Sequence, residues 1–177
     1  MQTTVGQITL VNTKVWFLEM HLRPSVVPAV PSSVSFERLT GFIDAVIYRK
    51  FYYGVGKKWH WLDRMVMPDK ELEKAINSVN TEIWIMKIEG KDAGFAEFVK
   101  ENEFTEILYF GLLPDYIGQG LGKFFLQWVI EKAWSFQPKW IQLNTCELDH
   151  KNALPVYLKS GFEIVREEIQ ERKVLKE

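Results

Sequence analysis

The chain has 177 residues, of which 47% are hydrophobic and 14% aromatic, so it can fill an ordinary core without disulfide bonds. Its 22 Lys and Arg residues against 23 Asp and Glu residues give no overall attraction for nucleic acid or for an anionic membrane. Any recognition of an anion must therefore be local.

The cysteine content and the hydrophobic runs indicate the compartment. One cysteine, Cys146, excludes an intramolecular disulfide, and the first basic residue, Lys14, comes too late to open a secretory signal. Charges interrupt every apolar run before the ~20 residues that would span a bilayer. We expect a cytoplasmic protein of one domain, 1–177, with no membrane or nucleic acid as partner.

The first predicted elements are two strands and a helix. Strands are expected at 15–22 and 34–39, separated by a proline-rich connection that bars regular pairing. Apolar residues at helical spacing predict a helix over 42–53, and Gly54 and Gly56 are expected to end it.

Three strands follow a second, short helix that Pro68 and Asp69 begin. The strands are expected at 82–88, 93–99 and 104–112, with connections short enough for tight turns. This spacing predicts an antiparallel meander.

The last third alternates helices and strands. A largely buried helix is expected at 121–134, a strand at 140–146, and a helix that Asn152 caps and that ends before Gly161. A final strand is expected at 162–166. Beyond it, the charged tail keeps apolar residues, so pairing and fraying both remain open.

A glycine-spaced turn, Gly118-Gln119-Gly120-Leu121-Gly122-Lys123, joins the third meander strand to the long helix. Small residues let backbone N–H groups approach an anion, and the unpaired amides of a helix N-terminus favour negative charge. A dinucleotide loop would need glycine where Lys123 stands, and a nucleoside-triphosphate loop would need Ser or Thr in place of Phe124. The turn predicts a phosphate-bearing ligand of another kind.

The segment from Ile117 to Gly122 resembles the cofactor loop of the Gcn5-related N-acetyltransferase (GNAT) superfamily. The family pattern is Arg or Gln, two residues, Gly, one residue, Gly or Ala, and here Ile117 replaces the Arg or Gln. A second signature of the family is similar to Ala153, Tyr157 and the pair Gly161-Phe162, with His150 where the family most often has asparagine. The resemblance extends from about 81 to 166.

The resemblance implies an α+β fold with a mixed, mostly antiparallel central sheet, flanked by helices and splayed at the cofactor site. It implies an acceptor-side half at 1–80, a cofactor-binding half at 81–166 and a charged tail at 167–177. The implied activity is transfer of an acetyl group from acetyl-CoA to a primary amine of a small molecule or peptide, by direct attack. A non-catalytic acyl-CoA sensor is the alternative, and a homodimer stays open.

The resemblance also implies the cofactor-binding residues. Backbone groups at the end of the third meander strand would pair with the pantetheine arm, and the glycine turn would hold the pyrophosphate. The expected residues are Phe110, Gly111, Leu112, Ile117, Gly118, Gln119, Gly120, Leu121, Gly122, Lys123 and Asn152.

Two residues are expected to carry the chemistry. Tyr157 is the candidate general acid, because a phenol can donate a proton to a departing thiolate. Glu106, eleven residues before Ile117, stands where the histone-acetyltransferase branch carries its basic glutamate. Glu97, on the preceding strand, and a water molecule are the alternatives to Glu106.

A cluster of indoles and polar groups precedes the second helix. Trp59, His60, Trp61 and Asp63 are expected to bind the acceptor, although a satellite core under a loop explains the tryptophans equally well. Cys146 is expected to be a small core residue. The three histidines and the cysteine show no metal-ligand spacing, so no metal is expected.

Overall fold

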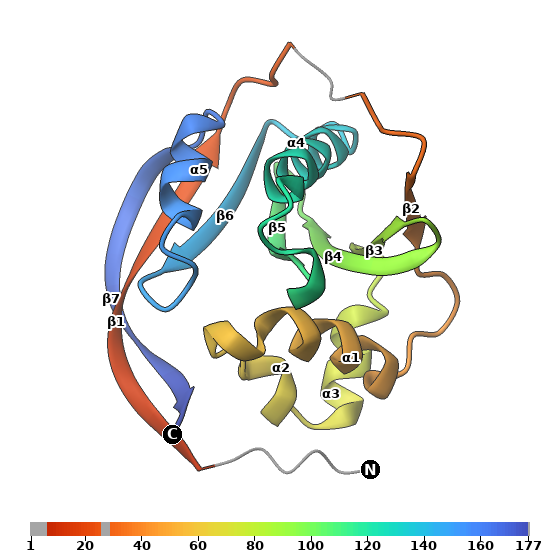
Figure 1. Cartoon of the computed structure of the whole chain (residues 1–177). Coiled ribbons are helices and arrows are strands. Elements are labelled where there is room, and N and C mark those ends of the chain that lie inside the picture. The colour runs from red at the N-terminus through yellow and green to blue at the C-terminus, as the bar shows by residue number, and fades with distance from the viewer. Residues whose placement is uncertain (1–6, 26–28, 177) are drawn as a thin grey trace.

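The computed structural model describes residues 7–25 and 29–176, so part of the proline-rich connection lies outside it (Figure 1). Seven strands form one sheet in the order β2-β3-β4-β5-β6-β1-β7, and among the described residues only β5 and β6 pair in parallel. The sheet confirms the expected α+β fold. The strands are β1 (Ile8–Met20), β2 (Val34–Arg38), β3 (Thr81–Ile88), β4 (Lys91–Lys100), β5 (Phe104–Leu112), β6 (Trp140–Cys146) and β7 (Glu163–Leu175).

Five α-helices and two short 3-10 helices connect the described strands. The meander of β3, β4 and β5 and the bounds of α4 and β6 agree with the sequence-based expectation. The helices are α1 (Ala45–Gly56), η1 (Lys57–Trp59), α2 (Asp63–Val66), α3 (Asp69–Ile76), η2 (Pro114–Tyr116), α4 (Leu121–Trp134) and α5 (Ala153–Lys159).

Helix α1 runs through Gly54 to Gly56, three residues beyond the expected end. A Cβ on Gly54 would lie 2.8 Å from the Leu113 side chain, and one on Gly56 would lie 2.4 Å from Cβ of Trp61. These glycines therefore allow β5 and Trp61 to pack closely against the helix. The helix begins where the Asp44 side chain accepts a 2.7 Å hydrogen bond from the Val46 amide.

The charged tail is a strand. β7 pairs with β1 from Glu19 opposite Glu163 to Ile8 opposite Leu175, so both strands are much longer than expected. In Figure 1 they form a long curved ribbon at one edge of the molecule. The sequence left the pairing of the tail open, because the residues of β1 that complete its backbone hydrogen bonds lie more than 140 positions away.

Two cores cover the two faces of the sheet. On one face α4 buries Phe125, Leu126 and Val129 against the strands, and α5 packs beside it. On the other face α1 and α3 bury Tyr52 and Leu72 over β3 and β4. Each fully buried apolar side chain contributes about 1.5–3 kcal/mol. The cores fix β5 between two helical layers, so its end is held in place where the cavity opens.

Candidate active site

The parallel strands β5 and β6 separate after a short contact. They pair only from Phe104 opposite Trp140 to Glu106 opposite Gln142. A bulge follows, because the register between β4 and β5 shifts where Glu97 opposes Tyr109 and Phe98 opposes Ile107. Residues 107–112 of β5 thus turn one backbone edge away from β6, which confirms the splayed strand pair expected from the sequence.

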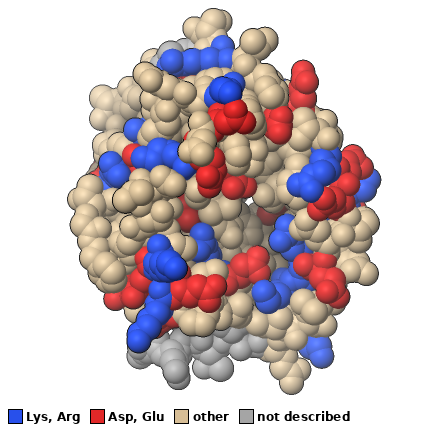
Figure 2. Space-filling model, turned by 180° about the vertical axis from the view of Figure 1, so that it is seen from behind, with Lys and Arg blue, Asp and Glu red and all other residues tan. Residues whose placement is uncertain are grey.

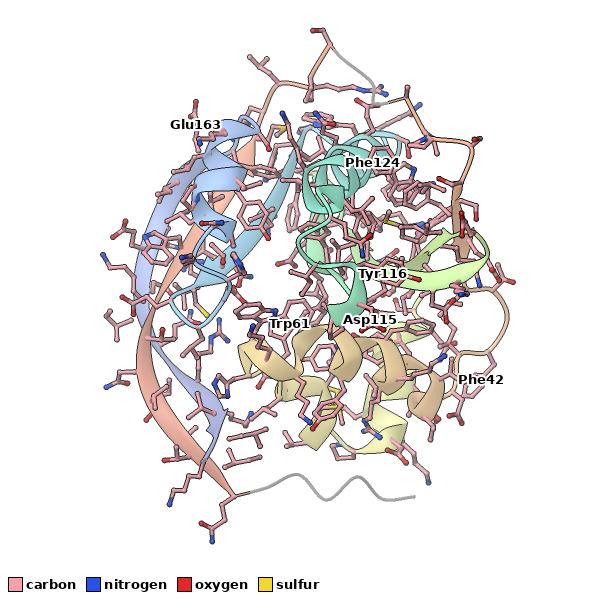
Figure 3. All side chains as sticks on the ribbon, viewed as in Figure 1. Phe42, Trp61, Asp115, Tyr116, Phe124 and Glu163 are labelled. Carbon is pink, nitrogen blue, oxygen red and sulfur yellow. The ribbon has the colours of Figure 1, made fainter. Side chains whose placement is uncertain are left out.

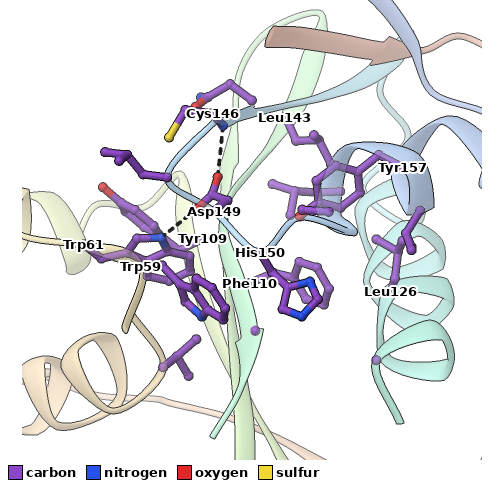
Figure 4. Close-up of a pocket in the computed structure, with 18 of the residues that line it drawn as sticks. Trp59, Trp61, Tyr109, Phe110, Leu126, Leu143, Cys146, Asp149, His150 and Tyr157 are labelled. Carbon is purple, nitrogen blue, oxygen red and sulfur yellow. Dashed lines mark hydrogen bonds between the residues drawn. The ribbon is translucent and has the colours of Figure 1, made fainter. Parts of the chain in front are cut away.

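A cavity of about 790 Å³ lies at this separation (Figure 4). Its walls come from β5, from the start of α4, from α5 and the loop before it, and from the segment that joins α1 to α2. Of the expected site residues, these line it: Trp59, His60, Trp61, Asp63, Phe110, Gly111, Leu112, Ile117, Gly122, Lys123, Asn152 and Tyr157. Glu106, Gly118, Gln119, Gly120 and Leu121 are not in its lining.

The glycine turn reaches the cavity with its last two residues, Gly122 and Lys123. Gly118 and Gly120 have φ of +84° and +76°, which side chains rarely adopt, and a Cβ at either would meet no atom within 4 Å. α4 starts directly after Gly120, with Lys123 in its first turn. The open space over the turn and the free amides of the helix start suit a phosphate group.

Tyr157 faces the cavity from α5. Its ring packs 6.4 Å from that of Phe110 and 6.2 Å from that of Phe162, measured between centroids. The described residues include no hydrogen-bond partner for its hydroxyl, which leaves the proton available to a ligand. Burial, and then the negative charge of Asp149, raise the pKa of Tyr157 above its ordinary value.

Glu106 lies at the point where the two strands part. It is the last residue of β5 that pairs with β6, opposite Gln142. Burial, and then the nearby charge of Glu101, raise the pKa of its carboxyl group. Since Glu106 is outside the cavity lining, a proton from a substrate in the cavity would reach it through water.

Glu97, the alternative base, belongs to a buried ionic network. Its carboxylate is fully buried, lies 3.1 Å from the Arg64 guanidinium and accepts a hydrogen bond from the Tyr48 hydroxyl. The Glu97 carboxylate is thus bound by Arg64 and Tyr48 within the core under α1. Glu106, in contrast, lies where β5 and β6 part.

The indole cluster lines the cavity rather than only filling a core. The Trp61 indole nitrogen donates a 3.2 Å hydrogen bond to Oδ1 of Asp149, and the Trp59 ring lies 5.2 Å from the His150 ring. Figure 3 shows Trp61 between the α1–α2 segment and the loop that follows β6. These contacts tie the first half of the chain to the second across the cavity.

His60 and Asp63 are held by the end of β7. The His60 ring accepts a 3.3 Å hydrogen bond at Nδ1 from the Leu175 amide, and His60 itself has a φ of +56°. Asp63 forms a 3.0 Å ion pair with Lys173. The charged tail therefore completes the wall that the indole cluster begins.

Asp149 and Arg172 line the cavity but were not among the residues expected in the site. Asp149 accepts hydrogen bonds from Trp61, from the Thr145 hydroxyl at 2.7 Å and from the Cys146 amide at 3.1 Å. The position of Asp149 in the loop after β6 was the sequence feature that could have indicated a site residue. Arg172 also lines the cavity, and it could not be placed before the pairing of β7 was known.

The expectation that Cys146 is a core residue is wrong. Its side chain is half-buried and lines the cavity, because it stands at the last position of β6. Asn152 occupies the N-cap position of α5, as expected, but its side chain makes no capping hydrogen bond. Instead its backbone N–H donates to Nδ1 of His150 over 3.1 Å.

The described residues hold no group of three or more His, Cys, Asp or Glu arranged to bind a metal ion. None of the helices within 7–25 and 29–176 is long and apolar enough to cross a membrane. Figure 2 shows acidic and basic side chains interspersed over one face of the molecule.

A splayed sheet beside a glycine turn is the arrangement that the sequence resemblance implied. The model of the acetyltransferase (GNAT) family matches residues 39–162, well over half of the chain. The chain belongs to this family. No curated protein matches its sequence.

Solved structures share the fold at low sequence identity. A GCN5-related N-acetyltransferase from Sphaerobacter thermophilus is 13% identical with a TM-score of 0.63, over 92% of this chain and 51% of that chain. One from Kribbella flavida is 16% identical with a TM-score of 0.57, over 94% and 58%. The chain thus spans little more than half the length of these proteins.

A third similar structure is an aminoglycoside acetyltransferase, meta-AAC0020, from an uncultured soil metagenomic sample, in complex with sisomicin. It is 13% identical with a TM-score of 0.54, over 72% of this chain and 86% of that chain. At such identities the similarity shows the fold alone.

Proposed function

We propose that this protein is an N-acetyltransferase that moves an acetyl group from acetyl-CoA to a primary amine by direct attack in a ternary complex. The observation that carries this proposal is one continuous cavity. It joins the start of α4 and the free edge of β5 to the indole cluster, and Tyr157 faces it. A cofactor arm and an acceptor could therefore meet beside a proton donor.

The residues present fit acetyl-CoA. The turn at Gly118 and Gly120 leaves open space at a helix N-terminus for a pyrophosphate, and Lys123 adds a positive charge there. The edge of β5 that β6 leaves at Glu106 offers backbone groups to the amides of a pantetheine arm. A cavity of about 790 Å³ is within the range of ligand pockets.

Acetyl-CoA, when bound, supplies an activated thioester. Backbone N–H groups near Phe110 to Leu112 would stabilise the charge that develops on the carbonyl oxygen. The Tyr157 hydroxyl would protonate the departing sulfur, and its raised pKa keeps the proton in place until then. Glu106 would accept the amine proton through water, since its raised pKa makes it a stronger base than an ordinary glutamate.

The two halves, 1–80 and 81–166, are proposed to work as one domain with the tail. This is supported by the single sheet, in which β1 pairs with both β6 and β7. A reducing compartment, which we take to be the cytoplasm, is consistent with the free Cys146 at the cavity.

Calorimetry with acetyl-CoA and a thiol-release assay with a panel of amines test the proposal. Saturable binding of acetyl-CoA together with amine-dependent release of free thiol would support it. Binding without thiol release from any amine would favour the alternative, an acyl-CoA sensor. Ile117 and His150, which differ from the family pattern, support that alternative. Absence of both binding and release would contradict both functions.

A further inference from the structure

We propose that the acceptor is a zwitterion, an apolar α-amino acid whose ammonium group binds Asp149 and whose carboxylate binds Arg172. This inference rests on the proposed function, because it names the substrate class of the same site. It starts from the charges that line the acceptor end of the cavity.

Two opposite charges at this end have no ion-pair partner in the part of the chain that the structure describes. Asp63 and Lys173 neutralise each other through their 3.0 Å ion pair. Asp149 and Arg172 line the same cavity, and neither takes part in an ion pair with a described residue. Asp149 therefore remains for a ligand as the unpaired carboxylate of the described lining, and Arg172 as the unpaired cation on β7. Lys123 and Lys159 line the cavity from α4 and α5.

Asp149 is placed to hold an amine beside the proton donor. Its Oδ2 accepts from Thr145 and Cys146, whereas among the described residues Oδ1 accepts from Trp61 alone. A carboxylate oxygen has two lone pairs, so Oδ1 can take one more donor. Asp149 and Tyr157 line the same cavity, and the charge of Asp149 contributes to the raised pKa of Tyr157.

Arg172 lies within electrostatic reach of the same region. Burial and then Asp149 raise the pKa of the Cys146 thiol, and the positive charge of Arg172 opposes that rise. Both charges thus act on one side chain at the end of β6. A guanidinium binds a carboxylate through two parallel hydrogen bonds, which makes arginine well suited to an amino acid's carboxylate.

Aromatic rings form the rest of this wall. Tyr52, Trp61 and Tyr109 pack against one another, with the Trp61 ring 5.6 Å from Tyr52 and 5.2 Å from Tyr109 between centroids. Trp59 lines the cavity beside them. Such a surface favours an apolar or aromatic side chain on the acceptor.

The lining disfavours acceptors with several positive charges. A polyamine or aminoglycoside would need several free carboxylates, and the described lining offers Asp149 and the already paired Asp63. Arg172 would repel the additional cations. The charge pattern therefore points to one amine and one carboxylate in the same small molecule.

The test compares phenylalanine, phenylalaninamide and phenethylamine as acceptors for the wild type, R172A and K176A. Wild type should prefer phenylalanine in kcat/KM by about tenfold or more, since a charge-assisted hydrogen-bonded pair is lost with the other two. R172A should abolish this preference. K176A removes an exposed charge just after β7, outside the cavity lining, and should keep the preference.

Calorimetry gives a second readout without turnover, on protein saturated with coenzyme A. Phenylalanine should bind more tightly than its amide to the wild type and no more tightly to R172A. A wild type that prefers either analogue without a carboxylate, or a preference that R172A retains, would overturn the inference. Lack of thiol release from every amine would instead contradict the proposed function, and the calorimetric comparison would still decide the zwitterion inference.

Discussion

The Trp61 indole nitrogen and Oδ1 of Asp149 are joined by a 3.2 Å hydrogen bond across the cavity. Trp61 follows η1 in the first half of the chain, and Asp149 follows β6 in the second. Since Asp149 is also close enough to Tyr157 to raise its pKa, this bond links the acceptor wall to the proposed acid.

W61F should therefore weaken acceptor binding while acetyl-CoA binding stays as in the wild type. The phenyl ring keeps part of the packing and loses the donor to Asp149, at roughly 1 kcal/mol of stability. The measurement is KM for the acceptor beside the calorimetric Kd for acetyl-CoA. W16F is the matched control, because the Trp16 indole also donates a hydrogen bond to a carboxylate, that of Glu167 at 3.0 Å, and Trp16 is not in the cavity lining. Equal rises in acceptor KM for both variants would contradict the role of Trp61.

G120V should abolish binding of acetyl-CoA. The valine carries backbone strain of about 1–2 kcal/mol at a φ of +76°, and its side chain would fill the open space over the turn. G41V is the control, since Gly41 has a φ of +75° with the same open surroundings but lies between β2 and α1, whereas Gly120 directly precedes α4. Both variants should lose similar thermal stability, and only G120V should lose the calorimetric signal. Retained binding by G120V would rule out the turn as the phosphate site.

Y157F should lower kcat by about 100-fold or more and leave the affinity for acetyl-CoA unchanged. The hydroxyl is the group that would protonate the departing thiolate, and the ring contacts with Phe110 and Phe162 survive the change. Because the pKa of Tyr157 is raised above ~10, the phenol stays protonated between about pH 6 and pH 9. An alkaline loss of activity in that range would thus not be its titration. Full activity of Y157F would exclude it as the acid.

E106Q should lower kcat/KM by about 100-fold or more and remove the acid limb of its pH profile. A carboxyl group works as a base only when ionised, so activity should fall as pH decreases through the raised pKa of Glu106. E101Q offers a second, opposite test. The charge of Glu101 helps to raise that pKa, so its removal should move the acid limb to lower pH. An unchanged acid limb in E106Q would exclude Glu106 as the base.

R64M should destabilise the fold by about 3–5 kcal/mol, because it leaves the fully buried Glu97 carboxylate without its ion-pair partner. The measurement is chemical denaturation. K50M breaks the ion pair between Lys50 and Asp92, in which the Lys50 side chain is 71% exposed, and should have a much smaller effect. Similar losses for both variants would contradict a structural role for the buried network.

The expected elements of the second half were the most accurate. The bounds of α4 and β6 agree with the structure, because Gly120 and Pro138 mark local stops that any fold must respect. The pairing of the charged tail was left open, and its long pairing with β1 was not predicted, since neither strand contains a signal for a partner so far along the chain. The extension of α1 through Gly54 was missed because the reason for the glycine is Leu113, a distant contact.

By itself, the sequence determined that a glycine turn at Gly118 to Gly122 precedes a buried helix, and that Tyr157 and Gly161-Phe162 follow in the order typical of one family; it also predicted that the turn binds a phosphate. These features are local in the chain, so spacing was enough to find them. Only the tertiary structure decided which groups meet in the cavity. Asp149, Arg172 and Trp61 come from three separate segments. They line one cavity only because β1, β6 and β7 pair in one sheet.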